Sequence, residues 1–407
     1  MDTKNTYDLI IIGSGGAGCA AALEAKKKSD NILILTKSFK KFSKTANAQG
    51  GLQASFGDGD SAALHFEDTM KAGNFKSDPA LVKILTERSR ATVEWLENLG
   101  VFFDRTEENN FKLKTAAGVS IPRVLSCGDS TGNKIVEPIL KRVAEAGIEV
   151  QEDAGVKRVE KKNGIFTLKV QGLEEDFTLT TRALIIATGG LLPKEKRAGL
   201  ALGKIKDIPD GVSLAEQLGA TCVHPDLMQY HPTGIILPKA LRRKRLPETM
   251  RGAGARILNK NKEVFIDPLT TRNKLTQAIV ETCNDGMGVV TEDGYQGVWL
   301  ITPDLDKIKG EGFTEKNYPT FYNLFLEHGH DLTKEPVLVY PIVHYGLGGI
   351  EINEKTETSV EGLFSAGETT WGVHGEERLM GNSLLDIFVF GRIAGQNAIA
   401  YALNKHE

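Results

Sequence analysis

Histidine and arginine side chains set among glycines are the residues of this chain best suited to hold a small anion. His231 lies in a QYHPTG segment, His344 in VHYGLGG, and Arg378 in HGEERLMGNS. Glycines allow a ligand to approach closely, and the planar guanidinium of an arginine can bind a carboxylate through two parallel hydrogen bonds. Each residue alone would fit an ordinary surface loop. Their combination predicts a site for an anionic substrate.

Strands and a helix must position these side chains. A strand-like run closes in Ala366–Gly367–Glu368, and the apolar stretch after Asn382–Ser383 is predicted to be a helix. The free backbone N–H groups and the dipole at a helix N-terminus favour negative charge. The end of the chain is therefore expected to contribute directly to the anion site.

A glycine-rich turn near the N-terminus indicates where a nucleotide would bind. Residues 7–12 (YDLIII) are typical of a buried parallel strand, and GSGGAG follows before an alanine-rich helix predicted up to about Lys28. Gly13 can make the tight turn, Gly15 lets backbone approach a pyrophosphate, and Gly18 lets helix and strand pack closely. With the strand at 31–36, this βαβ unit predicts dinucleotide binding.

The residues after the second strand argue against an ordinary NAD site. NAD-binding folds carry an acidic residue roughly 20 residues after the glycine turn, but this strand ends in Thr36, Lys37 and Ser38. FAD stays open. The loop SKTANAQGG at 43–51 could approach a flat polar ring, and LIIATGG at 184–190 has the form of a strand that ends in a second phosphate- or ribose-side turn.

Seven motifs in a fixed order resemble one family of flavoproteins. They are SKTANAQGG, IIATGG, QYHPTG, RGAGARILN, HYGLGGI, LFSAGE and HGEERLMGNSLLDIFVFGRIAG, spread over nearly the whole chain. In this order they resemble the flavoprotein subunits of succinate dehydrogenase and fumarate reductase and the related L-aspartate oxidases. The resemblance implies FAD chemistry on a small dicarboxylate.

The resemblance implies an α/β fold, with a Rossmann-like FAD-binding domain built on a parallel sheet and interrupted by an α+β capping domain. Mapped on this chain, the FAD-binding domain comprises residues 1–228 and 341–407, and the capping domain comprises residues 229–340. The flavin motifs therefore fall at both ends of the sequence. Because the chain stops soon after the helix at 391–403, we expect no C-terminal helical domain of the kind seen in longer relatives.

The resemblance also implies which residues bind FAD. They are Gly13, Ser14, Gly15, Ala17, Gly18, Thr36, Lys37, Ser43, Thr45, Ala48, Gln49, Gly50, Gly51, Val156, Ala187, Thr188, Gly189, Asp210, Glu368, Asn382, Ser383 and Leu384. Lys44 stands where the complex-type dehydrogenases attach FAD through a histidine. We therefore predict that FAD is held without a covalent bond, which in this family favours alkene reduction or an oxidase.

Interconversion of a dicarboxylate and its unsaturated form needs anion clamps at both ends, a hydride donor on one face and a proton donor on the other. The residues that match the family's substrate and proton-transfer residues are His231, His344, Arg378, Arg272, Glu248 and Arg251. The resemblance implies that the first three bind carboxylates, that Arg272 donates the proton, and that the last two form its relay. A guanidinium must be reprotonated quickly to act in this way.

Three departures from the family pattern affect residues that are expected near the substrate. Pro247 replaces a threonine that precedes the relay glutamate, a basic insertion LPKALRRKR comes just before it, and Glu376–Glu377 replaces small and amide residues next to Arg378. These changes favour a dicarboxylate-like acid other than fumarate, and we expect Glu376–Glu377 to be where a changed substrate is recognised.

Two alternative functions remain open. In an L-aspartate-oxidase-like enzyme, a glutamate receives the substrate ammonium, but the matching segment 114–119 (KTAAGV) has no acid, and an unpaired buried ammonium is costly. The other alternative is a degenerate FAD-binding subunit for electron transfer or assembly. The complete set of matching substrate residues argues against it.

Composition limits the remaining classes of function. The 407 residues carry a net charge of −3 with a pI near 6.3, so no basic field indicates nucleic-acid binding, and the one basic cluster, 242–245, is typical of a solvated loop that could draw an acidic partner. The four cysteines are far apart and form no CxxC pair, so we expect no metal or iron–sulfur site.

Electrons must therefore come from a partner, predicted to be an iron–sulfur or other electron-transfer subunit or a diffusible carrier. The N-terminus does not have the pattern of a signal peptide, and no apolar run approaches the roughly 20 residues that span a bilayer. We expect a cytoplasmic protein that reaches a membrane, if at all, through its partner.

Overall fold

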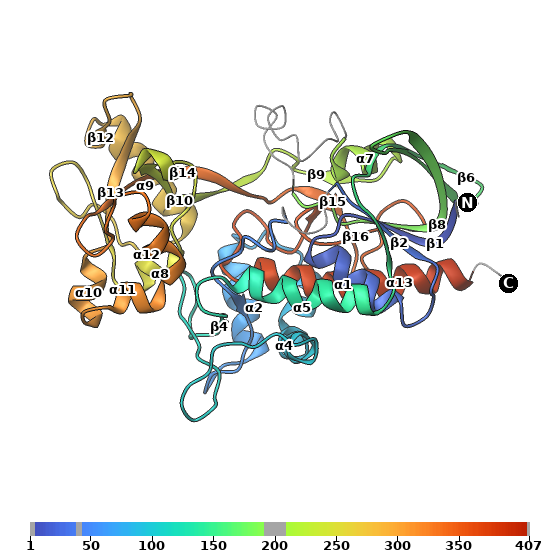
Figure 1. Cartoon of the computed structure of the whole chain (residues 1–407), viewed down its shortest axis with the longest axis horizontal. Coiled ribbons are helices and arrows are strands. Elements are labelled where there is room, and N and C mark those ends of the chain that lie inside the picture. The colour runs from blue at the N-terminus through green and yellow to red at the C-terminus, as the bar shows by residue number, and fades with distance from the viewer. Residues whose placement is uncertain (1–4, 38–42, 191–208, 405–407) are drawn as a thin grey trace.

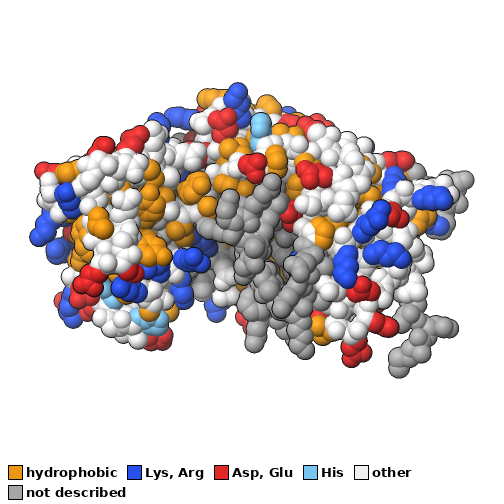
Figure 2. Space-filling view, turned by 90° about the horizontal axis from the view of Figure 1, so that it is seen from above, with side chains coloured by type: hydrophobic (Ala, Val, Ile, Leu, Met, Phe, Trp, Pro, Cys, Tyr) orange, Lys and Arg blue, Asp and Glu red, His pale blue; other side chains and the backbone are white. Residues whose placement is uncertain are grey.

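The chain folds into two units that lie side by side, each built on its own sheet (Figure 1). The computed structural model describes residues 5–37, 43–190 and 209–404. None of the helices in these ranges is both long and apolar enough to cross a membrane. On the face drawn in Figure 2, acidic and basic side chains are interspersed rather than separated by sign.

The first unit is organised around a seven-stranded sheet with a parallel centre. Its strand order is β5-β2-β1-β8-β7-β6, and β16 pairs with the second half of β8. The parallel strands are β1 (Thr6–Ile12), β2 (Ile32–Leu35), β5 (Glu149–Gln151), β8 (Asp176–Ile186) and β16 (Leu363–Ser365). Strands β6 (Gly155–Lys162) and β7 (Ile165–Gln171) extend it as an antiparallel meander. The predicted α/β fold with a parallel sheet is confirmed.

Both faces of the central strand are buried, which explains its uninterrupted apolar sequence. Leu9 and Ile11 pack into the cluster under the helices, whereas Ile10 and Ile12 pack into the cluster formed with the meander. Within the described residues, the helices of this unit are α1 (Gly16–Ala25), α2 (Ala62–Ala72), α3 (Pro79–Glu87), α4 (Ser89–Asn98), α5 (Thr131–Glu145), α7 (Gly211–Gln217) and α13 (Asn382–Asn404).

The first and last helices, α1 and α13, pack directly against each other along their length (Figure 1). Gly391 and Gly395 lie four residues apart on one face of α13. A Cβ added at Gly391 would lie 2.6 Å from the carbonyl oxygen of Ala17, and one at Gly395 would lie 2.1 Å from that of Ala21. The glycines of the FGRIAG motif therefore let the two ends of the sequence meet at backbone distance.

Short strands complete the first unit. They form a two-stranded sheet of β3 (Leu52–Gln53) and β4 (Val124–Leu125), and a three-stranded sheet of β9 (Cys222–Val223), β15 (Gly349–Glu351) and β17 (Thr370–Trp371).

The second unit has an antiparallel sheet and its own hydrophobic core. Its strands, in the order β10-β14-β13-β11 with β12 beside β13, are β10 (Met228–Leu237), β11 (Arg256–Leu258), β12 (Val289–Val290), β13 (Gln296–Ile301) and β14 (Val337–Gly346). Its helices are η1 (Lys239–Leu241), α8 (Glu248–Gly252), α9 (Arg272–Asn284), α10 (Asp304–Lys309), α11 (Phe313–Asn317) and α12 (Pro319–Leu326).

The chain enters the second unit along β10 and leaves it along β14, and the two strands pair with each other from Met228↔Gly346 to Leu237↔Leu338. One two-stranded ribbon therefore links the units. The domain boundaries at 228/229 and 340/341 stay a prediction.

Candidate active site

The glycine turn after β1 is open to an anion. Gly13 has φ +111°, and a Cβ there would lie 2.3 Å from the carbonyl oxygen of Ala187. A Cβ at Gly18 would lie 1.9 Å from the carbonyl oxygen of Gly13, so the turn cannot hold larger residues. Gly15 is the N-cap of α1, and no side chain caps the helix there. A Cβ at Gly15 would meet only the Thr45 hydroxyl, at 3.8 Å.

Two small hydroxyl residues meet at the turn, Ser14 within it and Thr36 directly after β2. The buried hydroxyls of Ser14 and Thr36 lie 2.8 Å apart. Asp210 accepts a hydrogen bond from the Ser213 amide at the start of α7, 2.9 Å away. Burial lowers the pKa of Lys37, and Asp210 acts in the opposite direction. Val156 lies in β6, with its side chain in the core cluster that includes Ile12 and Leu35.

The loop at 43–51 lies between α1 and α5. The Thr45 hydroxyl accepts a hydrogen bond from the Gly16 amide at 3.1 Å, and the Ala48 carbonyl accepts one from the Gly132 amide at 2.7 Å. Lys44 Nζ lies 2.6 Å from Glu368 Oε1, and the Gly346 amide donates to the same oxygen at 3.1 Å. The loop thereby reaches both the first strand turn and the end of β14.

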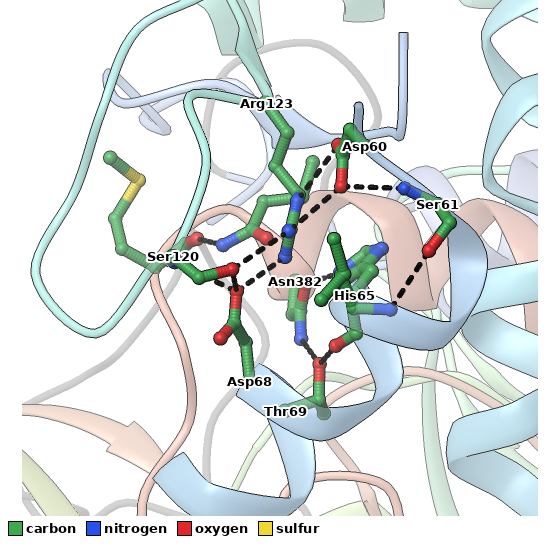
Figure 3. A network of polar contacts seen from close by, with 11 residues as sticks. Asp60, Ser61, His65, Asp68, Thr69, Ser120, Arg123 and Asn382 are labelled. Atoms are coloured by element: carbon green, nitrogen blue, oxygen red, sulfur yellow. Dashed lines mark hydrogen bonds and ion pairs between the residues drawn. The ribbon is translucent and has the colours of Figure 1, made fainter. Parts of the chain in front are cut away.

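A buried polar network fixes the N-terminus of α13 (Figure 3). The Asn382 side chain lies 2.8 Å from His65 Nε2 and donates to the Thr69 hydroxyl at 2.9 Å. The fully buried Arg123 bonds Asp60 and Asp68 in the same network. Because the side-chain amide of Asn382 already bonds two residues of α2, the predicted contact of Asn382 with FAD would involve its backbone atoms. Sequence reasoning missed Arg123, since no local pattern links it to α2.

Side chains from both units converge where β10, β14 and the loop before α13 meet. The rings of His231 and His344 lie 5.3 Å apart, centroid to centroid, and Arg378 NH2 lies 3.1 Å from His344 Nε2. His231 and Arg378 are 5% and 4% exposed. Burial, followed by the nearby arginines, holds the pKa values of both histidines well below the ordinary range, so the rings are neutral.

Three residues of the second unit form a buried ionic chain beside these histidines. Arg272 Nε donates to Glu248 Oε2 at 2.7 Å, and Arg251 NH2 lies 3.2 Å from the same oxygen. Burial raises the pKa of Glu248, but Arg272 and Arg251 outweigh burial and keep it below its ordinary value. Glu248 and Arg251 are three residues apart on α8, and Arg272 is the first residue of α9.

Two further residues orient this cluster and were not predicted. Gln229 accepts a hydrogen bond from Arg272 NH1 at 2.9 Å and donates to the carbonyl of Arg378 at 2.9 Å, so one amide ties the two arginines together. Thr233 contacts His231 Nδ1 through its amide and its hydroxyl, at 3.3 and 3.1 Å. Both residues belong to the QYHPTG motif, which was the available signal.

Arg245 was also missed, because the basic run 242–245 suggested a solvated loop. Arg242 pairs with Asp293, and Arg243 and Lys244 are exposed, as such a loop predicts. Arg245 instead points inward, and its NH1 contacts His344 Nδ1. The interpretation of the whole run as solvated is therefore wrong for this residue.

Glu377 contacts a helix of the second unit. Its Oε1 accepts a hydrogen bond from the Asn273 amide at 2.8 Å, at the N-terminus of α9. Glu376 is exposed and accepts a hydrogen bond from the Asn74 side chain at 3.2 Å. Glu377 therefore docks the start of α9 onto the loop that carries Arg378, and the expected role of Glu376–Glu377 in substrate recognition stays a prediction.

The comparisons with known proteins identify the family. A family model described as an FAD binding domain matches residues 8–384. The chain belongs to this FAD-binding family. One of the subunits of the fumarate reductase (CoM/CoB) from Methanothermobacter marburgensis is 34% identical over 415 residues, which cover 98% of this chain and 73% of that protein. L-aspartate oxidase from Acinetobacter baylyi is 31% identical over 415 residues, which cover 98% and 74%.

Solved structures agree with this assignment. A quinol–fumarate reductase with menaquinol molecules matches with a TM-score of 0.88 and 28% identity, over 99% of this chain and 72% of that chain. The protein is an FAD-dependent oxidoreductase of the flavoprotein type that includes fumarate reductases, succinate dehydrogenases and L-aspartate oxidases.

The residues of the flavoprotein fit its cofactor. The N-terminus of α1 behind Gly13 and Gly15 suits a pyrophosphate, because the N-cap Gly15 has no side chain to occupy it and the helix dipole favours an anion, although the Gly16 amide is bonded to Thr45. Gly51 has φ +121°, and a Cβ there would lie 2.1 Å from the carbonyl oxygen of Leu125, so the loop at 43–51 also needs glycine for close packing. The contacts of individual residues with FAD stay predictions.

Proposed function

We propose that the flavoprotein interconverts a small dicarboxylate and its unsaturated form, in the manner of a fumarate reductase or succinate dehydrogenase. The observation that carries the proposal is the buried chain Arg251–Glu248–Arg272, which ends beside His231, His344 and Arg378. The names of the relatives include fumarate reductases, and the residues at this place have the chemistry that such a reaction needs.

In this proposal the neutral histidines and Arg378 hold the carboxylates of the substrate. A buried guanidinium binds a carboxylate strongly because both of its hydrogen bonds are charge-assisted. Gln229 bonds the Arg272 guanidinium and the main-chain carbonyl of Arg378, each at 2.9 Å, so it ties the proton donor to the backbone of the residue that carries the carboxylate clamp. Bound FAD supplies or accepts the hydride.

Arg272 gives its proton from the guanidinium to the substrate carbon when the alkene is reduced. Glu248 lies within hydrogen-bond distance of both arginines and, being ionised, can accept a proton from Arg251 and pass it to Arg272. This route returns a proton to Arg272 after each turnover. Arg272 requires such a route because the guanidinium has a high pKa and must be reprotonated quickly.

The test is reoxidation of the chemically reduced holoprotein by unsaturated dicarboxylates without oxygen. Arg272→Ala is expected to keep its flavin but lose roughly 10²- to 10⁴-fold in rate, the usual contribution of a general acid. Arg256→Ala, a partly exposed arginine of β11, is the matched control and should behave as wild type. A near wild-type rate for Arg272→Ala would disprove the assignment.

We also propose that an electron-transfer subunit or carrier serves this flavin, because relatives of this type carry the name of a subunit or of a quinol-linked complex. FAD is proposed to be held without a covalent bond. Lys44 occupies the attachment position, and its ammonium is paired with Glu368, which leaves no histidine there for a flavin linkage.

A further inference from the structure

Arg245 is an arginine that the proposed reaction does not use. Backbone pairing holds its segment against β10: the Ile235 amide donates to the Lys244 carbonyl at 2.8 Å, and the Leu246 amide donates to the Thr233 carbonyl at 3.0 Å. Arg243 and Lys244 point to solvent from the same segment, whereas the Arg245 guanidinium reaches His344. The inward direction of Arg245 is therefore set by the strand pairing.

His344 lies between two guanidinium groups. Arg245 NH1 faces its Nδ1, and Arg378 NH2 lies 3.1 Å from its Nε2. A guanidinium can only donate hydrogen bonds, and a neutral imidazole has one acceptor nitrogen and one N–H. His344 can accept from only one of the two arginines, so one N–H group that faces the ring is left without an acceptor there.

The neighbouring carboxylates do not fill this need. Over residues 5–37, 43–190 and 209–404, neither Arg245 nor Arg378 forms an ion pair with a carboxylate, and Arg378 Nε is buried without a hydrogen-bond partner. Glu248 is shared by Arg251 and Arg272, and the Glu368 oxygen nearest to this region already binds Lys44 and the Gly346 amide. Among the described residues, two guanidinium groups thus meet at one neutral histidine, and no carboxylate lies within ion-pair distance of either.

A simple dicarboxylate accounts for only one of them. In the proposed function, Arg378 and the one net positive charge of the Arg251–Glu248–Arg272 chain offset the two charges of a dianion, so Arg245 adds a third positive charge. Burial lowers the pKa of Arg245, and Arg272 lowers it further, so an anion at this position would relieve an unfavourable local charge. Arg245 and His344 each keep a part of their surface exposed, so a ligand can reach them.

We propose that Arg245 is a specificity-determining residue that binds a third anionic group, and that the substrate is a tricarboxylate-like acid rather than a plain dicarboxylate. This inference rests on the proposed function, because it assigns the substrate class of the same site. It also places the change of specificity in the basic insertion, at Arg245, and not at Glu376–Glu377.

Saturated acids test the inference by binding alone, without turnover. Calorimetry on the holoprotein would compare butanedioate, methylbutanedioate and propane-1,2,3-tricarboxylate, which separate charge from added bulk. The wild type is expected to bind the tricarboxylate at least about tenfold more tightly than the other two, as one added charge-assisted contact predicts. Arg245→Met should remove this preference and leave butanedioate binding within about threefold of wild type.

Lys244→Met is the matched control, since Lys244 is exposed on the same segment, and it should keep the preference. The inference is overturned if the wild type binds the tricarboxylate no more tightly than butanedioate. It is also overturned if Arg245→Met weakens both acids equally, because Arg245 would then be a general clamp.

Arg378→Met separates the two proposals. If this variant loses butanedioate while the wild type shows no tricarboxylate preference, only the inference about Arg245 fails. If neither acid binds the wild type and Arg378→Met changes nothing, the proposed function fails with it.

Discussion

Glu377 is predicted to set the catalytic rate through the position of Arg272, although it touches no substrate in the proposed reaction. Its carboxylate accepts the Asn273 amide at 2.8 Å, and Arg272 is the adjoining residue at the start of α9. Glu377 is 6% exposed, so water cannot replace it without reorganisation. Changing this residue should loosen α9 and move the proton donor.

The structure gives the expected size of the effect. Glu377→Gln keeps an acceptor but removes the charge at the helix N-terminus, a loss of about 0.3–1 kcal/mol, or roughly two- to fivefold in kcat/KM if docking of α9 limits the rate. Glu377→Ala also removes a hydrogen bond to a charged acceptor, about 1.5–3 kcal/mol, which corresponds to roughly 10- to 150-fold.

The assay is anaerobic turnover of the holoprotein with a panel of unsaturated acids, measured against pH. Burial raises the pKa of the Glu377 carboxyl, so the ionised form that docks α9 is lost at a higher pH than for an ordinary carboxyl. The wild-type rate should therefore decrease as the pH falls through this raised pKa, and the Glu377→Gln variant should not show this decrease.

Glu376→Gln is the matched control, because Glu376 is exposed and its carboxylate contacts Asn74 rather than α9. It should retain the wild-type rate. The reasoning is refuted if Glu377→Gln changes the order of preference among the acids, since that would make Glu377 a substrate contact, or if Glu377→Ala retains full activity.

Three other predictions concern the cofactor, pH and packing. Acid precipitation of the holoprotein should release all flavin into the supernatant, and fluorescence that stays with the denatured protein band would contradict non-covalent binding. Burial lowers the pKa of His65 from 6.5 to about 4, so the folded protein holds this side chain neutral. Its contribution to the free energy of unfolding is complete above pH 6.5, and about 3 kcal/mol of it is lost as the pH falls to 4. Thermal melts should show this slope in the wild type and not in His65→Gln. Gly395→Ala should lower the free energy of unfolding by about 1–3 kcal/mol through overpacking against α1, whereas Gly252→Ala, whose Cβ would lie 3.8 Å from the Thr115 carbonyl oxygen, should be close to neutral in denaturant titrations.

The glycine motifs could be interpreted from sequence because their meaning is local. Gly13 needs a positive φ, and Gly18 must allow close backbone contact with the turn at Gly13, five residues earlier. Both requirements arise within one βαβ unit. The family resemblance supplied the parallel sheet and brought together His231, His344 and Arg378, which are far apart in sequence.

Arg245 and Glu377 could not be interpreted in this way. The direction of Arg245 depends on pairing with β10, which the four-residue basic run does not encode. The partner of Glu377 is the start of α9, more than a hundred residues earlier. For both residues the decisive contact is non-local, whereas Arg243 and Lys244 are exposed, as the basic run predicts.

The contact between α1 and α13 also orders events during synthesis. At about 5–20 residues per second, the ribosome finishes α13 tens of seconds after α1 has emerged. Until then the Ala17–Ala21 face of α1 has no partner at backbone distance, while the second unit is one continuous segment with its own core. The second unit, in the middle of the chain, can therefore fold before the first unit, which completes its packing only when α13 has been synthesised.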